Sequence, residues 1–423
     1  MKIENNPSEI KWPALCQRPQ MELEYLESSV KNILTRVKKS GDESLKELTK
    51  HFDQVEVNQL QVSEAEINEA IASVSEKLKQ AIQTASSNIE KFHAAQKTEI
   101  VKIETMPGVT CWRKGVAIQK VGIYIPGGSA PLFSTVLMLA IPAKLAGCQE
   151  VILCTPPSKD GKINPAILFA ASLSGIKKIF KVGGAQAIAA MAYGTNSIPS
   201  VNKIFGPGNQ FVTKAKQLIS QEGIAIDMPA GPSEVLVIAD ESANPVFIAA
   251  DLLSQAEHGA DSQVVLVTNS QSTVDKVLKS IEEQVEKLPR KEIAKEALKN
   301  SLAIIFDSQN QIIDFTNEYA PEHLIINTVD CDSISEKIIN AGSIFLGQYS
   351  PESIGDYASG TNHTLPTNGF AKAYSGVSLD SFMKFITIQK LTKEGLNQLG
   401  PVVEEMAEAE HLKGHAEAVR VRR

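Results

Sequence analysis

The segment EVLVIADESANPVFIAADLLSQAEHGADSQVVLVTN, residues 234–269, holds two short apolar runs on either side of a longer Ala- and Leu-rich stretch. The runs EVLVIAD and QVVLVTN are rich in Val, Ile and Leu and are typical of buried strands, whereas the stretch between them is typical of a helix. A strand, a helix and a second strand in this order predict a βαβ unit with parallel strands. This segment therefore predicts an α/β fold.

The same alternation continues over most of the chain. Six further apolar runs are separated by helical stretches, namely VGIYIP (121–126), EVILCTP (150–156), KIFKVGG (178–184), NKIFGPG (202–208), LAIIFD (302–307) and GSIFLG (342–347). So many strands predict two parallel sheets.

The two ends of the chain are rich in helical patterns. Residues 22–52 and 63–93 carry apolar residues at three- and four-residue spacing among charges, which predicts amphipathic helices. After Leu379 the pattern returns to helix. The final segment, residues 404–423, is charged and has too few apolar positions for a core of its own, so we expect it to pack on another surface.

Composition limits the classes of function. The chain has 423 residues, of which 43% are apolar and 22% charged, as in a globular protein with two or more domains. Its net charge is -7 and its only basic block is the terminal RVRR, so we expect small molecules rather than nucleic acid as partners.

The cysteines and the apolar runs indicate a cytoplasmic protein. Five cysteines are scattered without a C-x-x-C pair, which favours reduced thiols over disulfides or a thiolate zinc site. No apolar run approaches the roughly 20 residues that a membrane helix needs, and the N-terminus lacks the apolar core of a signal peptide. We therefore expect neither membrane insertion nor export.

Two glycine turns give the first indication of a ligand. Gly183-Gly184 and the stretch 206–209 (GPGN) each lie between a predicted strand and a predicted helix, where free N–H groups can bind a phosphate. Neither turn spells G-x-G-x-x-G, and a tight turn needs glycine in any case, so either turn alone could be purely structural. Tyr124 ends a strand near the same edge and could equally serve the core.

Gln255 and His258 give the second indication. They are three residues apart at the end of a predicted helix, so their side chains can converge on one point. That point could be a metal ion. For this fragment alone, a solvated helix face is the more common outcome.

A third group of residues has acid–base character. Glu322 and His323 follow Pro321, where a loop meets a strand, and a carboxylate beside an imidazole can move protons near neutral pH. Neighbouring residues in a strand point to opposite faces, so a bend is needed to bring both into one pocket, and a surface ion pair is the alternative. The Gly-rich segment SIGDYASGTNHTLPT adds Asp356 and His363, and the tail adds Glu410, His411 and His415.

Taken together, these blocks resemble the histidinol dehydrogenase family nearly end to end. The matching motifs are VGIYIPGGSAPLFSTVLM, VGGAQAIAA, FGPGN, IDMPAGPSEVLVIAD, LLSQAEHG, EYAPEHL and SIGDYASGTNHTLPT. They occur in the family's order and spacing, and DMPAGPSEVLVIAD is the most diagnostic.

The resemblance implies a set of site residues. It implies one zinc ion per subunit bound by Gln255, His258, Asp356 and His415. A zinc ligand set without thiolates is unlike that of a closed structural site. The open coordination positions of the ion would take the substrate. The implied substrate pocket consists of Ser233, Glu322, His323, Glu410 and the zinc ligands. The implied NAD contacts are Tyr124, Gln186 and Asn209.

The resemblance also implies an architecture. It is two incomplete Rossmann-like domains with parallel sheets, plus helical N- and C-terminal tail segments. The expected parts are an N-terminal tail (1–20), a first domain (21–120 and 236–378), an NAD-binding second domain (121–235) and a helical tail (379–423). The tail is expected to complete the site of the partner chain in a homodimer.

The implied reaction is a four-electron oxidation of L-histidinol through bound L-histidinal to L-histidine with two NAD+, the last step of histidine biosynthesis. His323 would serve as general base in both steps, and Glu322 would activate the water that adds to the aldehyde.

The chain departs from the family pattern in its tail. His411 stands where we expect glycine, and we assign it no role. Gly414 precedes His415 and makes a continuous helix there less certain.

Two other classes of function compete with this prediction. A zinc hydrolase would use similar ligands, but the chain has no H-E-x-x-H motif and a hydrolase does not need the glycine turns. A non-catalytic nucleotide-binding protein would explain those turns and leave Glu322 and His323 without a role.

Overall fold

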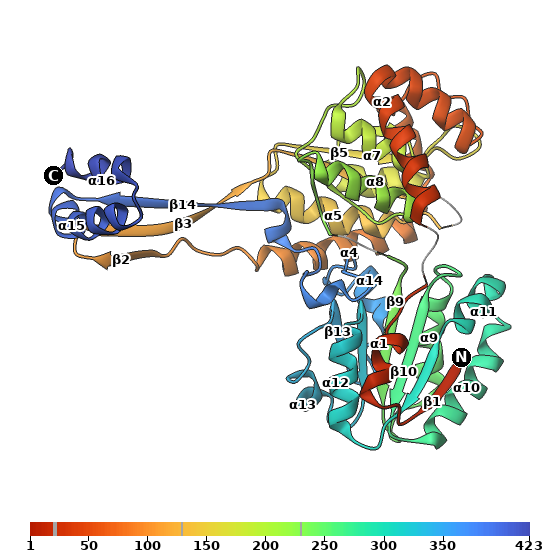
Figure 1. Cartoon of the computed structure of the whole chain (residues 1–423). Helices are drawn as coiled ribbons and strands as arrows, with labels where there is room; N and C mark the ends of the chain where they lie inside the picture. Colours follow the sequence, from red (N-terminus) through yellow and green to blue (C-terminus); the bar gives the residue numbers. More distant parts are fainter. Residues whose placement is uncertain (20–22, 128–129, 229–230) are drawn as a thin grey trace.

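The computed structural model describes residues 1–19, 23–127, 130–228 and 231–423, which form two parallel-sheet domains and a projecting arm (Figure 1). From here on, the first domain is the one built on residues 120–226, which were expected as the NAD-binding second domain, and it contains a five-stranded sheet in the order β6-β5-β4-β7-β8. Its strands are β4 (Lys120–Tyr124), β5 (Glu150–Thr155), β6 (Lys178–Lys181), β7 (Lys203–Phe205) and β8 (Ala225–Ile226). The helices between them are α5 (Phe133–Ala146), α6 (Pro165–Leu173), α7 (Gly184–Tyr193) and α8 (Gln210–Gln221).

Three N-terminal helices cover the five-stranded domain. They are α2 (Leu23–Phe52), α3 (Glu64–Ser73) and α4 (Glu76–Ala94). Helix α2 packs on α7 and α8, α3 packs on α6, and α4 packs on α5. The apolar stripes of these amphipathic helices are thereby buried against the first domain.

The second domain contains a six-stranded parallel sheet in the order β1-β11-β10-β9-β12-β13. Its strands are β1 (Lys2–Asn5), β9 (Glu234–Ala239), β10 (Gln263–Thr268), β11 (Leu302–Ile305), β12 (His323–Asn327) and β13 (Ser343–Leu346). Its helices are α1 (Trp12–Leu15), α9 (Pro245–Ala256), α10 (Gln271–Val285), α11 (Lys291–Lys299), α12 (Gln309–Tyr319), α13 (Cys331–Ser335) and α14 (Glu352–Tyr357), and a 3-10 turn spans Glu9–Lys11.

Strand β9 shows why the central runs are apolar without alternation. Val235 and Val237 belong to the core shared with α9, α10 and α11. Leu236 and Ile238 belong to the core on the opposite face, with α1 and α12. Because both faces are covered, every position of the strand is buried.

The two sheets share one strand order. If the edge strand β1 is left out, each sheet has five strands. When these are numbered by their order in the chain, they lie side by side in the order 3-2-1-4-5. This is the Rossmann order without its sixth strand. The prediction of two incomplete Rossmann-like domains with parallel sheets is therefore confirmed.

A thin arm projects from the first domain (Figure 1). It is an antiparallel ribbon in the order β14-β3-β2, made of β2 (Lys102–Met106), β3 (Val109–Ala117) and β14 (Met383–Leu391). Helices α15 (Lys393–Ala409) and α16 (Lys413–Arg420) lie at its tip, and 3-10 turns at Phe370–Lys372 and Leu379–Phe382 precede β14. We use "the arm" for residues 102–117 and 383–423.

The predicted strands are confirmed, and the terminal segments differ in detail. All eight apolar runs contain a strand, namely β4, β5, β6, β7, β9, β10, β11 and β13. The expected helix over 63–93 is broken at Val74, because Ser75 caps a new helix. Residues 2–5 of the N-terminal tail form an edge strand beside β11.

The C-terminal segment is not helical throughout. The expectation of helix directly after Leu379 is wrong for residues 383–391, which pair with β3 along their whole length. The sequence KFITIQK is rich in aromatic and β-branched residues, which favour a strand.

The N-terminal helices also group differently from the expected domains. Residues 23–94 pack mainly on the five-stranded sheet domain, because their partner surface lies on helices of residues 133–221, and α4 also contacts residues 236–378 through the bond from Asn88 Nδ2 to the Ala358 carbonyl. Among the described residues, no helix is both long and apolar enough to span a membrane.

Candidate active site

A cluster of acidic, imidazole and amide side chains lies at the amino-terminal edge of the six-stranded sheet. Glu322 and His323 precede and begin β12, Gln255 lies in the last turn of α9, and Asp356 lies in α14. His258 follows α9, and its backbone N–H donates to the carbonyl of Gln255. The cluster thus draws on three elements that are far apart in the sequence.

The Glu322–His323 pair is buried and fixed by the start of β9. The Oε2 of Glu322 accepts a hydrogen bond from the backbone N–H of Glu234 at 2.9 Å. His323 Nδ1 lies 3.3 Å from the carbonyl oxygen of Glu234 and 3.6 Å from Glu322 Oε2. Ala320, with φ of 51°, ends α12 and makes the bend that brings both side chains to one place.

His323 is surrounded by acceptors. Its Nε2 lies 3.2 Å from Asp356 Oδ1, so both ring nitrogens face oxygen atoms, which favours the doubly protonated ring. Burial lowers the pKa of His323, but Glu322 and Asp356 outweigh it and raise that pKa overall. Burial raises the pKa of Glu322 despite its imidazole neighbour.

Asp356 connects the pair to two more histidines. His363 lies with Nδ1 2.7 Å from the Asp356 carbonyl oxygen and Nε2 2.9 Å from Thr135 Oγ1. Burial raises the pKa of Asp356, but the neighbouring His323, His363 and His258 bring it below its usual value. Burial lowers the pKa of His258. The sequence left His363 without a role, and the structure makes it a support for the Asp356 backbone.

Glu352 is a cluster residue that the sequence prediction missed. Its Oε1 accepts from Ser254 Oγ at 2.6 Å and lies 3.2 Å from the amide nitrogen of Gln255, in the amide orientation that satisfies both neighbours. In that orientation the Gln255 oxygen lies 3.1 Å from the backbone nitrogen of Glu234. Burial raises the pKa of Glu352 to about 7. Its i, i+4 spacing from Asp356 was the sequence signal that could have found it.

The predicted zinc ligands are only partly brought together within one chain. Gln255, His258 and Asp356 offer an amide oxygen, an imidazole nitrogen and a carboxylate. His415 is exposed on α16 and Glu410 is exposed at the end of α15, at the tip of the arm and away from the cluster (Figure 1). Over the described ranges, no group of three or more His, Cys, Asp or Glu side chains could hold a metal ion.

Ser233, the remaining predicted substrate residue, is half-buried directly before β9. Its carbonyl oxygen accepts a hydrogen bond from the backbone N–H of Gln263. It thus lies next to Glu234, the residue that holds the acid–base pair.

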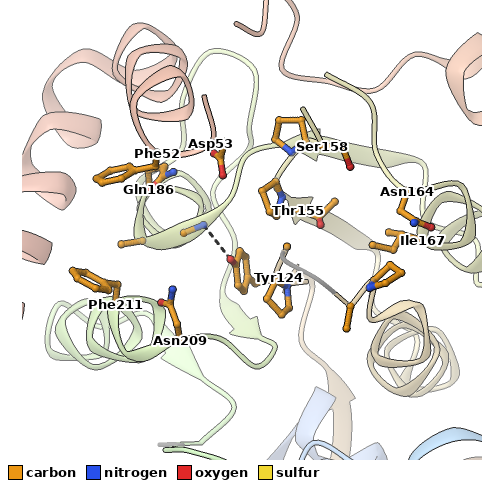
Figure 2. Close-up of a pocket in the computed structure, with 18 of the residues that line it drawn as sticks. Phe52, Asp53, Tyr124, Thr155, Ser158, Asn164, Ile167, Gln186, Asn209 and Phe211 are labelled. Carbon is orange, nitrogen blue, oxygen red and sulfur yellow. Dashed lines mark hydrogen bonds between the residues drawn. The ribbon is translucent and has the colours of Figure 1, made fainter. Parts of the chain in front are cut away.

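A separate cavity of about 830 Å³ lies at the carboxyl ends of the strands in the five-stranded sheet (Figure 2). Tyr124, Gln186 and Asn209, the predicted NAD contacts, all line it. Tyr124 Oη accepts from the backbone N–H of Gly184 at 3.0 Å, so its own hydrogen remains available to a ligand. Asn209 caps α8 by accepting from the Val212 N–H.

The second glycine turn is fixed on both sides. The N–H of Gly206 donates to Asp227 Oδ2 at 2.8 Å, and its carbonyl accepts from Lys216 Nζ at 3.0 Å. Gly206 has φ of 126°, and a Cβ there would overlap the carbonyl oxygen of Tyr124. Glycine is thus required here by backbone geometry and by close packing.

Comparison with known proteins identifies the family of the chain. The family model described as histidinol dehydrogenase matches residues 16–423. The chain is 60% identical to a histidinol dehydrogenase of Bacteroides fragilis (strain YCH46), over 100% of this chain and 99% of the relative. Its identity to the Vibrio parahaemolyticus enzyme is 53%, over 98% and 96% of the two chains.

Solved structures give the same result. The crystal structure of histidinol dehydrogenase from Elizabethkingia anophelis matches with a TM-score of 0.98 and 57% identity, covering 100% of this chain and 98% of that one. The chain therefore belongs to the histidinol dehydrogenase family, a family of NAD-dependent oxidoreductases.

Proposed function

We propose that the chain oxidises L-histidinol through bound L-histidinal to L-histidine, the last step of histidine biosynthesis. One histidinol, two NAD+ and one water give histidine, two NADH and three protons. Beyond the family membership, one observation carries the proposal: Glu322, His323 and Asp356 form a buried cluster with Gln255 and His258 nearby.

In the first oxidation, His323 takes the proton of the alcohol while the carbon loses its hydride. Neutral imidazole is the form that accepts this proton, so the doubly protonated ring that its neighbours favour must first release one. The carboxylates of Glu322 and Asp356, 3.6 Å and 3.2 Å from the ring nitrogens, stabilise the imidazolium that results.

In the second oxidation, Glu322 takes a proton from water as the water oxygen bonds to the aldehyde carbon, and His323 gives the proton gained in the first step to the aldehyde oxygen, which forms the hydrate. A buried carboxylate with a raised pKa is a stronger base than an exposed one, which suits this step. His323 then takes the proton of the hydrate as the same carbon loses its second hydride.

The donor chemistry of the cluster fits zinc, with one donor missing from a single chain. Gln255, His258 and Asp356 would hold the ion, and His415 on the arm of a second copy would complete the set. Zinc, when bound, would orient histidinol through its amino and imidazole nitrogens. We therefore propose a homodimer with shared sites.

The cavity of the first domain fits NAD, which supplies the hydride acceptor in both steps. Tyr124 can donate its phenolic hydrogen to the cofactor, and Gln186 and Asn209 line the same wall. The N-terminal ends of α7 and α8 add backbone N–H groups that suit a pyrophosphate.

A stoichiometric assay tests the proposed reaction. Histidinol and NAD+ should yield two NADH per histidine, measured as nicotinamide absorbance against histidine by chromatography. A zinc hydrolase or a non-catalytic NAD-binding protein would form no NADH, and a ratio of one would contradict the second oxidation.

Metal removal tests the zinc site. A strong chelator should abolish activity and added zinc restore it, while circular dichroism stays unchanged because the two sheet cores do not depend on the ion. His258→Asn should reproduce the chelated state. Full activity of protein shown to be metal-free by elemental analysis would rule out a catalytic zinc ion.

A further inference from the structure

One acidic residue in the wall of the cavity has no side-chain hydrogen bond or ion pair with any of the described residues. Asp53 follows the last residue of α2, and its backbone N–H donates to the Thr49 carbonyl at 2.9 Å. Its side chain lines the cavity, and Figure 2 draws the carboxylate pointing inward. Oδ2 is buried without a hydrogen bond among the described residues.

The position of the Asp53 carboxylate is unfavourable for the protein without a ligand. A carboxylate loses hydration when it is partly buried, and burial raises the pKa of Asp53 to about 6. Its position at the carboxyl end of a helix also places a negative charge near the negative pole of the helix dipole. An ionised carboxylate can only accept hydrogen bonds, so a ligand that relieves these costs must bring donors.

The surroundings of Asp53 indicate which part of a dinucleotide brings these hydrogen-bond donors. Phe52 and Phe211 line the cavity on the same side as Asp53 and Asn209 (Figure 2). Phe52 is 54% exposed, which leaves part of its ring free to contact a flat group. A base against these rings would bring its ribose beside Asp53.

The opposite end of the cavity leads toward the catalytic cluster. Pro131 lines the cavity two residues before α5, and Thr135 of that helix contacts His363. The reacting nicotinamide must face this end, so the base against Phe52 and Phe211 is the adenine.

We propose that Asp53 accepts hydrogen bonds from the 2′- and 3′-hydroxyls of the adenosine ribose and thereby selects NAD over its 2′-phosphorylated form. The inference rests on the proposed role of the cavity as the NAD site. A 2′-phosphate removes one hydroxyl donor and places its negative charge beside the carboxylate. Lys159, the one cationic side chain among the described lining residues, is exposed to solvent.

Two fragments of the cofactor test the assignment by titration calorimetry on the full chain, without substrate. Wild-type protein should bind ADP-ribose more tightly than 2′-phospho-ADP-ribose. Asp53→Asn should weaken ADP-ribose by on the order of tenfold, because a charged hydrogen bond is lost, and should tighten the phosphorylated fragment. The ratio of kcat/KM for NAD and NADP should shift in the same direction.

Glu43→Gln is the matched control, because it removes one charge from an exposed residue of the same helix. It should leave both affinities unchanged. Unchanged fragment preference in Asp53→Asn, or weakened binding of nicotinamide mononucleotide instead, would overturn the inference while the cavity remains an NAD site. Failure of wild-type protein to bind ADP-ribose or NAD at all would overturn the proposed cofactor site itself.

Discussion

The backbone groups of one residue, Glu234, contact both members of the acid–base pair. Its N–H donates to Glu322, and its carbonyl oxygen lies beside Nδ1 of His323. Its side chain forms a buried ion pair with Arg18 at 2.7 Å, and the Arg18 guanidinium also stacks on Tyr319. Because Glu234 begins the central strand β9, the pair is held by the sheet and not by a loop alone.

Substitutions in the pair should separate the two oxidations. His323→Asn should slow both steps by about a hundred- to ten-thousandfold, the usual contribution of a general base. Glu322→Gln should spare alcohol oxidation and slow the step that needs water. Supplying histidinal directly isolates that step. Wild-type rates on histidinal with Glu322→Gln would remove Glu322 from water activation.

The Arg18–Glu234 pair should be important for stability as well. Arg18→Met leaves a fully buried carboxylate without its cation, which should lower the free energy of unfolding by about 3–5 kcal/mol. Arg36→Met, which breaks an exposed pair with Glu47, should cost at most about 1 kcal/mol. Urea denaturation compares the two, and equal losses would mean that burial does not decide the effect.

Asp53 should make stability depend on pH. Its pKa in the folded protein is raised from 3.8 to about 6, so between these values the folded state binds more protons than the unfolded state. Stability contributed by this group is full below about pH 4 and is lost as pH rises through about 6. Asp53→Asn should therefore unfold at a higher temperature than wild type at pH 8 and at the same temperature at pH 4. A constant difference at both pH values would contradict this account.

At the scale of elements, strands that are buried on both faces could be predicted from the sequence, whereas a largely exposed strand was missed. The eight strand runs could be found because parallel strands covered on both sides must be almost wholly apolar. The ribbon strand β14 was missed because its burial is slight, so only its aromatic and β-branched residues mark it as a strand.

The site residues also divide into those that could be predicted from the sequence and those that could not. Glu322 with His323, and Gln255 with His258, are close in sequence and could be found as pairs. Glu352 had only its i, i+4 spacing from Asp356 as a signal, and Arg18 had none, because its partner Glu234 is 216 positions away in the sequence. Only the folded topology brings such residues together.

The turn between β7 and α8 offers a prediction at this scale. Gly206→Ala should weaken NAD binding, because its Cβ would overlap the Tyr124 carbonyl and shift the wall that carries the phenol. Gly223→Ala also has a positive φ, but its Cβ meets open space, so it should lose only the about 1–3 kcal/mol of backbone strain.

Equilibrium unfolding and NAD titration together make this comparison. A larger stability loss and weaker NAD binding only in Gly206→Ala would fit the overlap. Equal effects in both variants would show that backbone strain alone accounts for the changes in stability and NAD binding.

At the scale of the whole molecule, the arm is the feature that a single chain does not explain. Large exposed apolar side chains on it include Ile103, Ile386, Val402, Met406, Leu412 and Val421. The arm carries them away from both sheet cores (Figure 1). A surface of this kind favours association with a second chain. The predicted site residues Glu410 and His415 lie on the same arm, so we propose that association is linked to catalysis.

Complementation between two inactive variants tests whether that link is real. Glu322→Gln damages the body of the site and His415→Ala damages the arm, so each homodimer should be inactive for the complete reaction. If arms are exchanged, a mixed dimer contains one site built from an intact body and an intact arm. Random pairing after joint refolding makes half of the dimers mixed, with one working site in two, so about a quarter of wild-type activity should return.

The matched control is a mixture of Glu322→Gln and His323→Asn. Both substitutions lie in the body, so every site in every dimer keeps one of them whichever chain supplies the arm, and no activity should return. Mass spectrometry of the native dimers establishes that mixed species are present in both mixtures. If the Glu322→Gln and His415→Ala mixture then stays as inactive as its parents, each arm serves its own chain and must fold back toward the cluster. Recovery confined to that mixture requires exchange, because no arrangement within one chain can restore a site that carries either substitution.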